Sequence, residues 1–421
     1  MLYTYYGDDF TGSTDVLEQL AIGGLRAAVF LQPPTPQDLR LIPGLQAIGI
    51  AGDSRSRSPE WMSANLPAIF QHLRSFNAPI TQYKVCSTFD SSPTHGNIGR
   101  ALEIGLDVFQ SPVVPIVVGA PHLKRFVIKG QLFAADLRGN VQRIDRHPMS
   151  RHPTTPMREA NLRKHLAAQT TLPMTEVHDL HHLADLQSAN AKAALFDTVT
   201  PSDLEYIGQH IVSNASAHHP LFTIGSSGLT AALITTWLKQ RLIELSPYSA
   251  CSPSAKATSP LLVISGSCSP ATARQIRWAA NNGFHAIPID PMQLLSNSAT
   301  YAETLLRQAA HSLSTTSTIL YTATGTSTAT IPGPALGTAL GNLLRNILKL
   351  TQTSRILLCG GDTSSHAVQQ LNLRALTWLR SLEPGAPLCK AHLSTGESNY
   401  ELVLKGGQVG TESFFSLVER A

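Results

Sequence analysis

The sequence predicts an α/β protein with two domains, each built on a mainly parallel sheet flanked by helices, with a ligand cleft between the domains. Short apolar runs alternate with longer amphipathic segments, a pattern typical of parallel strands joined by helical crossovers. Several of these runs end in clusters of Gly, Ser and Asp, and ligands bind at the carboxyl ends of parallel strands. A length of 421 residues favours two domains over one.

The expected strands are the short apolar runs. They lie at residues 2–7, 45–52, 112–119, 192–198, 221–227, 261–267, 285–290, 318–325 and 355–361. Helical periodicity is clearest at residues 14–24, 60–76 and 270–283, and "AVQQLNLRALTWL" (367–379) is also helix-like. The segment "GPALGTALG" places Gly333, Gly337 and Gly341 at i, i+4 spacing, which predicts a helix that packs closely against a neighbour.

The predicted domain boundary is the segment at residues 245–260, which is rich in Ser, Pro and Ala and lacks periodicity. We therefore expect domains at 1–248 and 258–421. A second loop-like stretch, "RHPMSRHPTTPM" (146–157), contains three prolines and is expected to form a long loop or a lid in the first domain.

Composition argues against several classes of protein. The net charge is +4 and no dense Lys/Arg run is present, which favours a small anionic ligand over nucleic acid. Five widely spaced cysteines without a CxxC pair argue against a disulfide framework or a structural zinc site. The N-terminus does not resemble a signal peptide, and no apolar run approaches the ~20 residues of a membrane span. We expect a cytoplasmic protein without membrane or nucleic-acid partners.

The candidate residues of the first domain follow its strands. In "YYGDDFTGSTD", Asp8 and Asp9 could hold a metal ion, accept a hydroxyl proton or bind polyol hydroxyls, or one could cap the helix while the other is solvated. Arg55 in "GDSRSRSP" suits a carboxylate, although loop arginines are often only solvated. "YKVCSTFDSSPTHGNIG" adds Lys84 and several hydroxyls. Together these residues predict a polar, partly cationic pocket for a hydroxylated acid.

The second domain carries glycine and hydroxyl residues at its strand ends. They lie in "ISGSCSPATARQI", "YTATGTS", "LCGGDTSSH" and "LVLKGGQVG". Each could be no more than a capped helix after a glycine turn, but convergence of these corners favours binding of a phosphorylated ligand. No match to GxxxxGK[ST] is present, which excludes a P-loop enzyme.

At these residues the chain resembles the four-carbon acid sugar kinase family. The matching stretches occur in family order over nearly the whole chain. They are "GDDFTGSTD", "DSR", "YKVCST", "GNIG", "HPTTPM", "GSSGL", "SGSCSPATARQI", "GGDTSSHAV" and "LKGGQVG". The resemblance implies an ATP-dependent kinase for four-carbon acid sugars and their 3-oxo relatives, with the sugar acid in the N-terminal domain and ATP in the C-terminal domain.

The resemblance also implies roles for individual residues. The expected sugar-site residues are Asp9, Arg55, Lys84, Ser87 and Thr88. The expected nucleotide-site residues are Ser267, Gly360, Gly361, Asp362, Thr363, Gly406 and Gly407. Cys86 stands where many members carry an acid, and Asp90 is a hypothetical substitute for it. The "HPMSRHPTTPM" stretch is similar to a subgroup closer to kinases of 3-oxo-isoapionate and other unusual acids.

The expected mechanism is phosphoryl transfer by alignment and charge neutralisation. Arg55 and Lys84 would hold the substrate, and Asp8 or Asp9 would orient the attacking hydroxyl or accept its proton. Mg²⁺ would bridge the ATP phosphates without dedicated protein ligands, and domain closure would exclude water. The alternatives are a non-catalytic sugar-acid sensor and an NAD-dependent dehydrogenase, although no GxGxxG followed by an acid supports the latter. A homodimer is an open alternative.

Overall fold

The structure is a computed structural model that describes residues 1–136, 139–150, 155–180, 190–245, 260–296, 299–325, 333–393 and 396–421, apart from the side chains of 362 and 396–399. The chain divides into two compact units. Unit 1 comprises Met1–Ala27 and Gly44–Ser246, and unit 2 comprises Ala28–Pro43 and Pro247–Ala421. Most of the predicted linker, and residues 151–154 of the predicted lid, lie outside the described residues.

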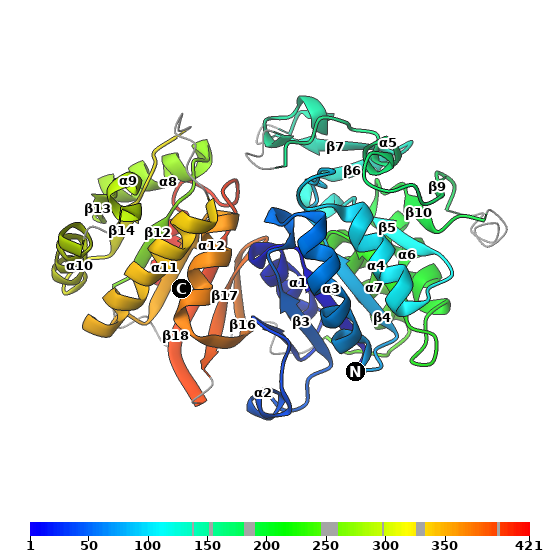
Figure 1. Ribbon diagram of the computed structural model, residues 1–421, viewed down its shortest axis with the longest axis horizontal. Helices are drawn as coiled ribbons and strands as arrows, with labels where there is room; N and C mark the ends of the chain where they lie inside the picture. The colour runs from blue at the N-terminus through cyan, green and yellow to red at the C-terminus, as the bar shows by residue number, and fades with distance from the viewer. Residues whose placement is uncertain are drawn as a thin grey trace. The chain divides into compact units, whose positions relative to one another are not determined.

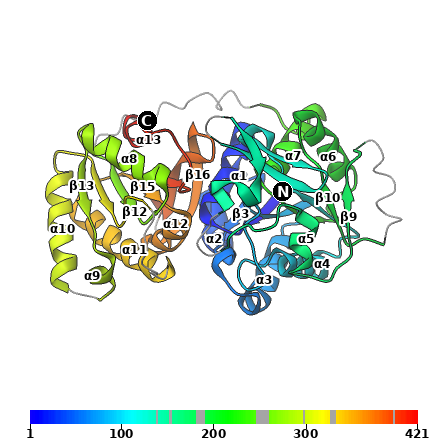
Figure 2. The same cartoon turned by 90° about the horizontal axis from the view of Figure 1, so that it is seen from above.

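Unit 1 contains a sheet in the order β3-β1-β4-β11-β5-β10-β9, in which every described pairing is parallel. The strands are β1 (Tyr3–Gly7), β3 (Ala47–Ala51), β4 (Ile80–Lys84), β5 (Val114–Val117), β9 (Met174–Val177), β10 (Ala193–Phe196) and β11 (Leu221–Gly225). The helices are α1 (Phe10–Ile22), α3 (Pro59–Arg74), α4 (Ile98–Phe109), α5 (Leu162–Ala167), α6 (Pro201–Ser213) and α7 (Ser227–Lys239). Helices α1, α6 and α7 cover one face of the sheet and α3 and α4 cover the other (Figure 2).

The register of this sheet brings several strand ends level. Gly7 at the end of β1 pairs with Ala51 on one side and Lys84 on the other, and Lys84 pairs with Gly225. The loops that leave β1, β3, β4 and β11 therefore begin at one edge. A small antiparallel sheet, β6 (Arg125–Ile128), β7 (Gln131–Ala135) and β8 (Val141–Arg143), follows β5. Figure 1 shows β6 and β7 beyond this edge of unit 1, on the side away from the N-terminus.

Unit 2 contains strands in the order β13-β14-β12-β15-β18-β17-β16-β2. The strands are β2 (Ala27–Phe30), β12 (Leu262–Ser265), β13 (His285–Pro288), β14 (Thr318–Tyr321), β15 (Arg355–Cys359), β16 (Leu373–Glu383), β17 (Ala386–Leu393) and β18 (Gly396–Lys405). β13, β14, β12, β15 and β18 pair in parallel, whereas β18, β17, β16 and β2 pair antiparallel. The α/β prediction with mainly parallel sheets is confirmed.

Helices flank the sheet of unit 2, with α8 and α13 on one face and α11 and α12 on the other (Figure 2). The helices are α2 (Pro36–Leu41), α8 (Pro270–Asn281), α9 (Pro291–Leu295), α10 (Ala299–Leu313), α11 (Gly333–Leu350), α12 (Gly361–Val368) and α13 (Phe414–Arg420). A Cβ on Gly341 of α11 would lie 2.6 Å from the Ala367 carbonyl of α12, so the predicted close packing is confirmed at Gly341. Among the helices described, none has the length and apolarity needed to cross a membrane.

The helix expected at residues 367–379 is wrong beyond Val368. The segment turns through Asn372, which has a left-handed φ of 55°, and continues as strand β16. Asn is one of the few non-glycine residues that adopts this conformation readily, and it commonly ends a helix. Pairing of β16 with both β17 and β2 overrides the local helical spacing.

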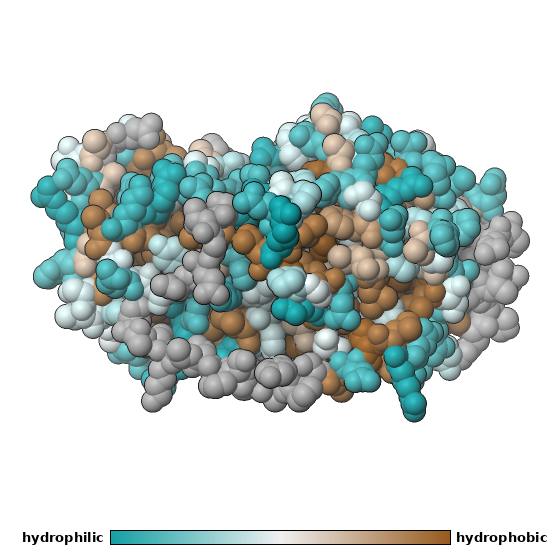
Figure 3. All heavy atoms as spheres, turned by 90° about the horizontal axis from the view of Figure 1, so that it is seen from below, coloured by the Kyte–Doolittle hydropathy of each residue, from teal (hydrophilic) through white to brown (hydrophobic). Residues whose placement is uncertain are grey.

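Each unit has its own hydrophobic core. The core of unit 1 includes Phe70, Tyr83 and Phe222, and that of unit 2 includes Leu357, Val403 and Phe415. The large apolar side chains that remain exposed come from many separate elements, including Met292, Leu350 and Leu417, which is normal for a folded protein. The face in Figure 3 accordingly shows both hydrophilic and hydrophobic residues.

Candidate active site

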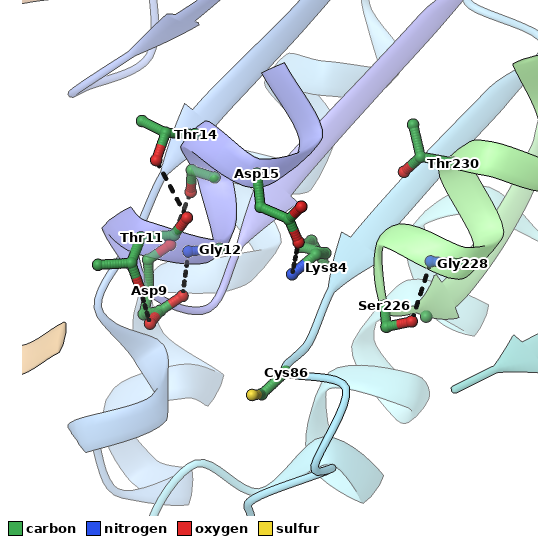
Figure 4. Close-up of polar contacts among 12 residues, drawn as sticks. Asp9, Thr11, Gly12, Thr14, Asp15, Lys84, Cys86, Ser226, Gly228 and Thr230 are labelled. Carbon is green, nitrogen blue, oxygen red and sulfur yellow. Dashed lines mark hydrogen bonds and ion pairs between the residues drawn. The ribbon is translucent and has the colours of Figure 1, made fainter. Parts of the chain in front are cut away.

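The first corner of unit 1 is the junction between β1 and α1. Asp9 caps α1: its Oδ1 accepts from the Gly12 backbone N–H at 2.7 Å, and its Oδ2 accepts from the Thr11 hydroxyl at 2.7 Å (Figure 4). A capping Asp satisfies orphan N–H groups and is favoured by the helix dipole. The capping role expected for one of the two acids therefore falls to Asp9.

Asp8 is not solvated but bound by Arg55, which lies in the short helix Ser54–Ser56 after β3. Arg55 donates from Nε to Asp8 Oδ2 at 3.0 Å and from Nη2 to Asp8 Oδ1 at 2.6 Å, and its Nη1 reaches Asp9 Oδ2 at 2.9 Å. All three side chains are buried, with exposed fractions of 2% for Asp8, 6% for Asp9 and 8% for Arg55. The guanidinium of Arg55 therefore already binds two carboxylates of the protein itself, those of Asp8 and Asp9.

The buried charges perturb one another. Burial raises the pKa of Asp8, and its contact with Arg55 only partly opposes this effect. For Asp9, burial acts in the same direction, but Arg55, Lys84 and the hydrogen bonds from Thr11 and Gly12 outweigh it and lower the pKa. Asp9 is therefore held as a carboxylate that already accepts hydrogen bonds at both oxygens.

Lys84, the last residue of β4, reaches the same corner. Its Nζ lies 3.6 Å from Asp15 Oδ2 on α1, and the lysine is 2% exposed (Figure 4). A Cβ on Gly12 would lie 2.5 Å from Asp9 Oδ1 and 3.0 Å from Lys84 Nζ. The absence of a side chain at Gly12 therefore lets Asp9 and Lys84 approach the first turn of α1 together.

The loop after β4 adds thiol, hydroxyl and carboxyl groups. The Thr88 hydroxyl lies 2.5 Å from Asp90 Oδ2 and 2.9 Å from Cys86 Sγ, while Ser87 is half-buried in the same loop. Burial, reinforced by Asp90, raises the pKa of Cys86 and keeps it a neutral thiol. The Asp90 carboxylate interacts with Cys86, and the buried Oδ1 of Asp90 has no hydrogen-bond partner among the described residues. The substitution of Asp90 for the acid of other family members stays a prediction.

Two residues that the sequence analysis did not single out come from the segment after β5, with His122 in the short helix Pro121–Leu123 and Arg125 at the start of β6. His122 interacts electrostatically with Asp15 and Lys84, and Arg125 interacts with Cys86. The segment is anchored at this edge because the Ser226 hydroxyl, at the start of α7, donates to the Val118 carbonyl at 2.8 Å. No pattern in the sequence indicates this approach, because the segment returns through a long-range contact.

The corner of unit 2 is built from the ends of β12, β15 and β18. Gly360, with φ of 108°, joins β15 to α12, and its N–H donates to the Lys405 carbonyl at 2.9 Å. A Cβ on Gly360 would lie 3.4 Å from the Ser267 side chain, and one on Gly407 would lie 3.0 Å from Ser267 Oγ. Thr363, in the first turn of α12, lies so close to Gly266 that a Cβ on Gly266 would collide with the Thr363 hydroxyl. The predicted glycine corners at these three strand ends do converge.

Lys405 lies beneath this corner and is fully buried. Its Nζ donates to the Thr272 hydroxyl at 3.1 Å and to the Gly406 carbonyl at 2.9 Å, and Thr272 in turn donates to the Gly407 carbonyl at 2.9 Å. Burial lowers the pKa of Lys405. The lysine ties the Gly406–Gly407 turn to the first turn of α8.

Two family models match successive parts of the chain. A sugar-binding N-terminal domain matches residues 3–233, and a nucleotide-binding C-terminal domain matches residues 262–415. The chain belongs to this two-domain family. The resemblance to the four-carbon acid sugar kinase family is therefore confirmed.

Family members of known name are similar over nearly the full length. A 3-oxo-isoapionate kinase from Paraburkholderia graminis is 38% identical, covering 99% of this chain and 94% of that protein. A 3-oxo-tetronate kinase from Pseudomonas fluorescens is 31% identical, covering 97% of this chain and 94% of that protein.

Solved structures share the fold. A Salmonella typhimurium protein described as a putative tRNA synthase has a TM-score of 0.77 at 25% identity and covers 100% of this chain and 99% of its own. A Haemophilus influenzae protein has a TM-score of 0.69 at 24% identity, with coverage of 99% and 98%.

The predicted sugar-site residues lie at the corner of unit 1, and the predicted nucleotide-site residues lie at the corner of unit 2. Unit 1 brings together Asp8, Asp9, Arg55 and Lys84, with Ser87 and Thr88 on the adjoining loop. Unit 2 brings together Ser267, Gly360 and Gly407, with Gly361, Thr363 and Gly406 directly beside them. The backbone of Asp362 lies in α12, but its side chain is outside the described part. Within the described residues, no group of three His, Cys, Asp or Glu could hold a metal ion.

Proposed function

We propose that this protein is an ATP-dependent kinase that phosphorylates a hydroxyl of a small sugar acid, four-carbon or branched, or its 3-oxo derivative. The observation that carries the proposal is the similarity to a 3-oxo-isoapionate kinase over 99% of the chain, which includes both corners. The two corners differ in the way that the reaction requires. One presents carboxylates and cations for a hydroxylated acid, and the other presents backbone groups for a nucleotide.

In this proposal Asp9 orients the attacking hydroxyl and receives its proton. The lowered pKa of Asp9 keeps it ionised, so its carboxylate is available as a hydrogen-bond acceptor that orients the attacking hydroxyl, and the proton moves to it only as the phosphoryl group is transferred. Asp8 holds Arg55 in place by two hydrogen bonds, and Arg55 in turn fixes Asp9. Lys84, paired with Asp15, supplies positive charge near the hydroxyl that accepts the phosphoryl group.

ATP occupies the glycine corner of unit 2. Gly360 and Gly407 leave the space that a Cβ would fill against Ser267, so that backbone N–H groups of the corner other than that of Gly360, which donates to Lys405, can approach the phosphates. Ser267, Gly361, Asp362, Thr363 and Gly406 complete the site. Mg²⁺ would enter with the nucleotide and would neutralise phosphate charge, and its ligands would come mainly from phosphate and water oxygens, since no group of three His, Cys, Asp or Glu among the described residues could hold it.

The test is ADP release from ATP and Mg²⁺ with a panel of acids. The panel comprises D- and L-threonate, D-erythronate, their 3-oxo forms and 3-oxo-isoapionate. We expect acid-dependent ADP formation, with 3-oxo-isoapionate the first candidate because of the similarity above. ATP binding without acid-dependent ADP formation from any member would contradict the kinase proposal and favour the non-catalytic sensor. Binding of NADH in place of ATP would favour the dehydrogenase. A homodimer and a cytoplasmic location stay predictions.

A further inference from the structure

The arginine expected to hold the substrate carboxylate is already occupied. The Nε and Nη2 atoms of Arg55 form the edge of the guanidinium that matches a carboxylate, and both donate to Asp8. The remaining Nη1 donates to Asp9. Lys84 is likewise paired with Asp15. A substrate carboxylate that took either cation would leave a buried aspartate without its partner, which is costly.

Arg125 presents the same guanidinium edge, formed by Nε and Nη2, but no carboxylate of the described residues binds it. Its Nη1 donates to the backbone carbonyls of Leu123 at 2.8 Å and Lys124 at 3.1 Å, which fixes the guanidinium. Its Nη2 meets only the thioether of Met149, at 3.0 Å, and its buried Nε has no hydrogen-bond partner among the described residues. Burial lowers the pKa of Arg125, as expected for a desolvated cation that lacks an anion.

The rest of the chain indicates what belongs on this edge. Five arginines of the described chain direct both Nε and Nη2 at one carboxylate. These pairs are Arg55–Asp8, Arg57–Asp53, Arg143–Asp145, Arg355–Glu401 and Arg374–Asp38. In Arg125 a thioether takes the place of that carboxylate. A thioether is a weak acceptor on a flexible chain, so an incoming carboxylate can displace it at little cost.

Arg125 is also in the right place. Arg125 interacts with Cys86, which in turn interacts with Arg55 and Lys84 of the aspartate corner. The same segment carries His122, which interacts with Asp15 and Lys84. The segment therefore approaches the corner at two points. The neutral Cys86 thiol does not compete for the guanidinium.

We propose that Arg125 binds the carboxylate of the sugar acid through its Nε and Nη2 atoms, and so selects acids over neutral sugars. The proposal rests on the proposed kinase function and changes the anchor of the substrate from Arg55 to Arg125. The substrate then lies with its carboxylate at Arg125 and a hydroxyl at Asp9. The Oδ1 of Asp90, which has no hydrogen-bond partner among the residues that the structure describes, then accepts from a second hydroxyl.

The test compares each acid with its neutral amide in the wild type, Arg125→Met and Arg125→Lys. Arg345→Met is the matched control, because the buried Nε of Arg345 also has no hydrogen-bond partner in the described part of the chain, but Arg345 lies on α11 of unit 2. We expect Arg125→Met to raise the KM of the acid about a hundredfold and to remove the preference for acid over amide, with the KM of ATP unchanged. Arg125→Lys keeps the charge but not the fork, and should lose about tenfold.

The outcomes separate this inference from the proposed function. If wild-type enzyme turns over an acid and Arg125→Met or Arg125→Lys keeps the full preference for acid over amide, the inference is overturned while the kinase stands. If Arg125→Met is insoluble, the lysine variant decides alone. A parallel rise in the KM of acid, amide and ATP would indicate a structural role and overturn the inference. No turnover of any acid by the wild type overturns both proposals.

Discussion

The two corners of the molecule both lie at the carboxyl ends of strands, but they are built from different kinds of chemical group. The corner of unit 1 consists of buried charged side chains, and Asp8, Asp9, Arg55 and Lys84 are each at most 8% exposed. The corner of unit 2 consists of glycines, hydroxyls and backbone groups around Ser267, and its cation Lys405 is covered by the turn it supports. In the proposed function, the corner of unit 1 recognises its ligand through side-chain charge and the corner of unit 2 through the shape of its backbone.

This difference predicts different sensitivities. A charged corner depends on the ionisation of each member, so a neutral isostere is enough to disable it. A backbone corner tolerates changes of charge but not the addition of a Cβ where the backbone adopts a left-handed conformation or lies against a neighbour. The following variants test this division, beginning with the largest expected effect.

Asp9→Asn should lower kcat by about a thousandfold, because the amide can no longer accept a proton. Asn is also a good helix cap, so the fold should be retained. ATP affinity, measured by titration calorimetry, should change less than twofold because the proposed nucleotide site is the corner of unit 2. Asp290→Asn is the control, since Asp290 caps α9 in the same way at an exposed position. Loss of ATP binding in Asp9→Asn would break the division into two sites.

Gly360→Ala should raise the KM of ATP by about ten- to a hundredfold. Its φ of 108° strains any residue with a Cβ, and that Cβ would lie 3.4 Å from Ser267. Gly283→Ala is the matched control, because φ is 97° there and no atom lies within 4 Å of the new Cβ. Both variants should lose similar stability in thermal melts, but only Gly360→Ala should affect ATP. Equal KM values for ATP in the two variants would count against a nucleotide site at Gly360.

The sequence was informative where function follows strand ends. Asp8, Asp9 and Lys84 lie directly after or at the end of apolar runs, and parallel strands necessarily bring such positions to one edge. The same reasoning placed the glycine corners of unit 2 together. It could not find Arg125, because that residue reaches the edge on a hairpin whose position depends on long-range contacts. The sequence also could not show that Asp8 already occupies the carboxylate-binding edge of Arg55.

Local pattern was a poorer guide to the antiparallel part of unit 2. The run at 367–379 has helical spacing, and only its pairing with β17 and β2 makes part of it a strand. Asn372 was the one local signal of the break. Likewise, Ala28–Pro43 belongs to unit 2 although it is surrounded in the sequence by residues of unit 1. The ion pair between Asp38 and Arg374 fixes this segment, and no local pattern reveals a partner so distant in the chain.

Lys405→Met should raise the KM of ATP about tenfold, less than Gly360→Ala, because the lysine acts through the turn above it. The change removes two hydrogen bonds, to Thr272 and to the Gly406 carbonyl, each worth about 1 kcal/mol. The KM of the sugar acid should not change. Lys349→Met, at an exposed position on α11, is the control. If the KM of ATP were the same in Lys405→Met as in the wild type, the lysine would not support the nucleotide site.

The last prediction concerns stability in acid rather than turnover, and it places part of that acid sensitivity in unit 1. His165 packs beside Phe89 and bonds Ser91 of the loop after β4 at 2.7 Å, and burial lowers its pKa to about 4. Between pH 6.5 and 4 the unfolded chain binds a proton at this residue that the folded chain does not, so stability falls as the pH falls. The loss attributable to His165 between pH 7.5 and 5 should be about 2 kcal/mol. Urea unfolding of His165→Gln should show a correspondingly flatter dependence on pH, whereas His311→Gln, at an exposed position, should match the wild type. If His165→Gln kept the wild-type slope, His165 would not be a source of acid sensitivity, and the other histidines of unit 1 with lowered pKa values, His122, His147 and His210, would be tested next.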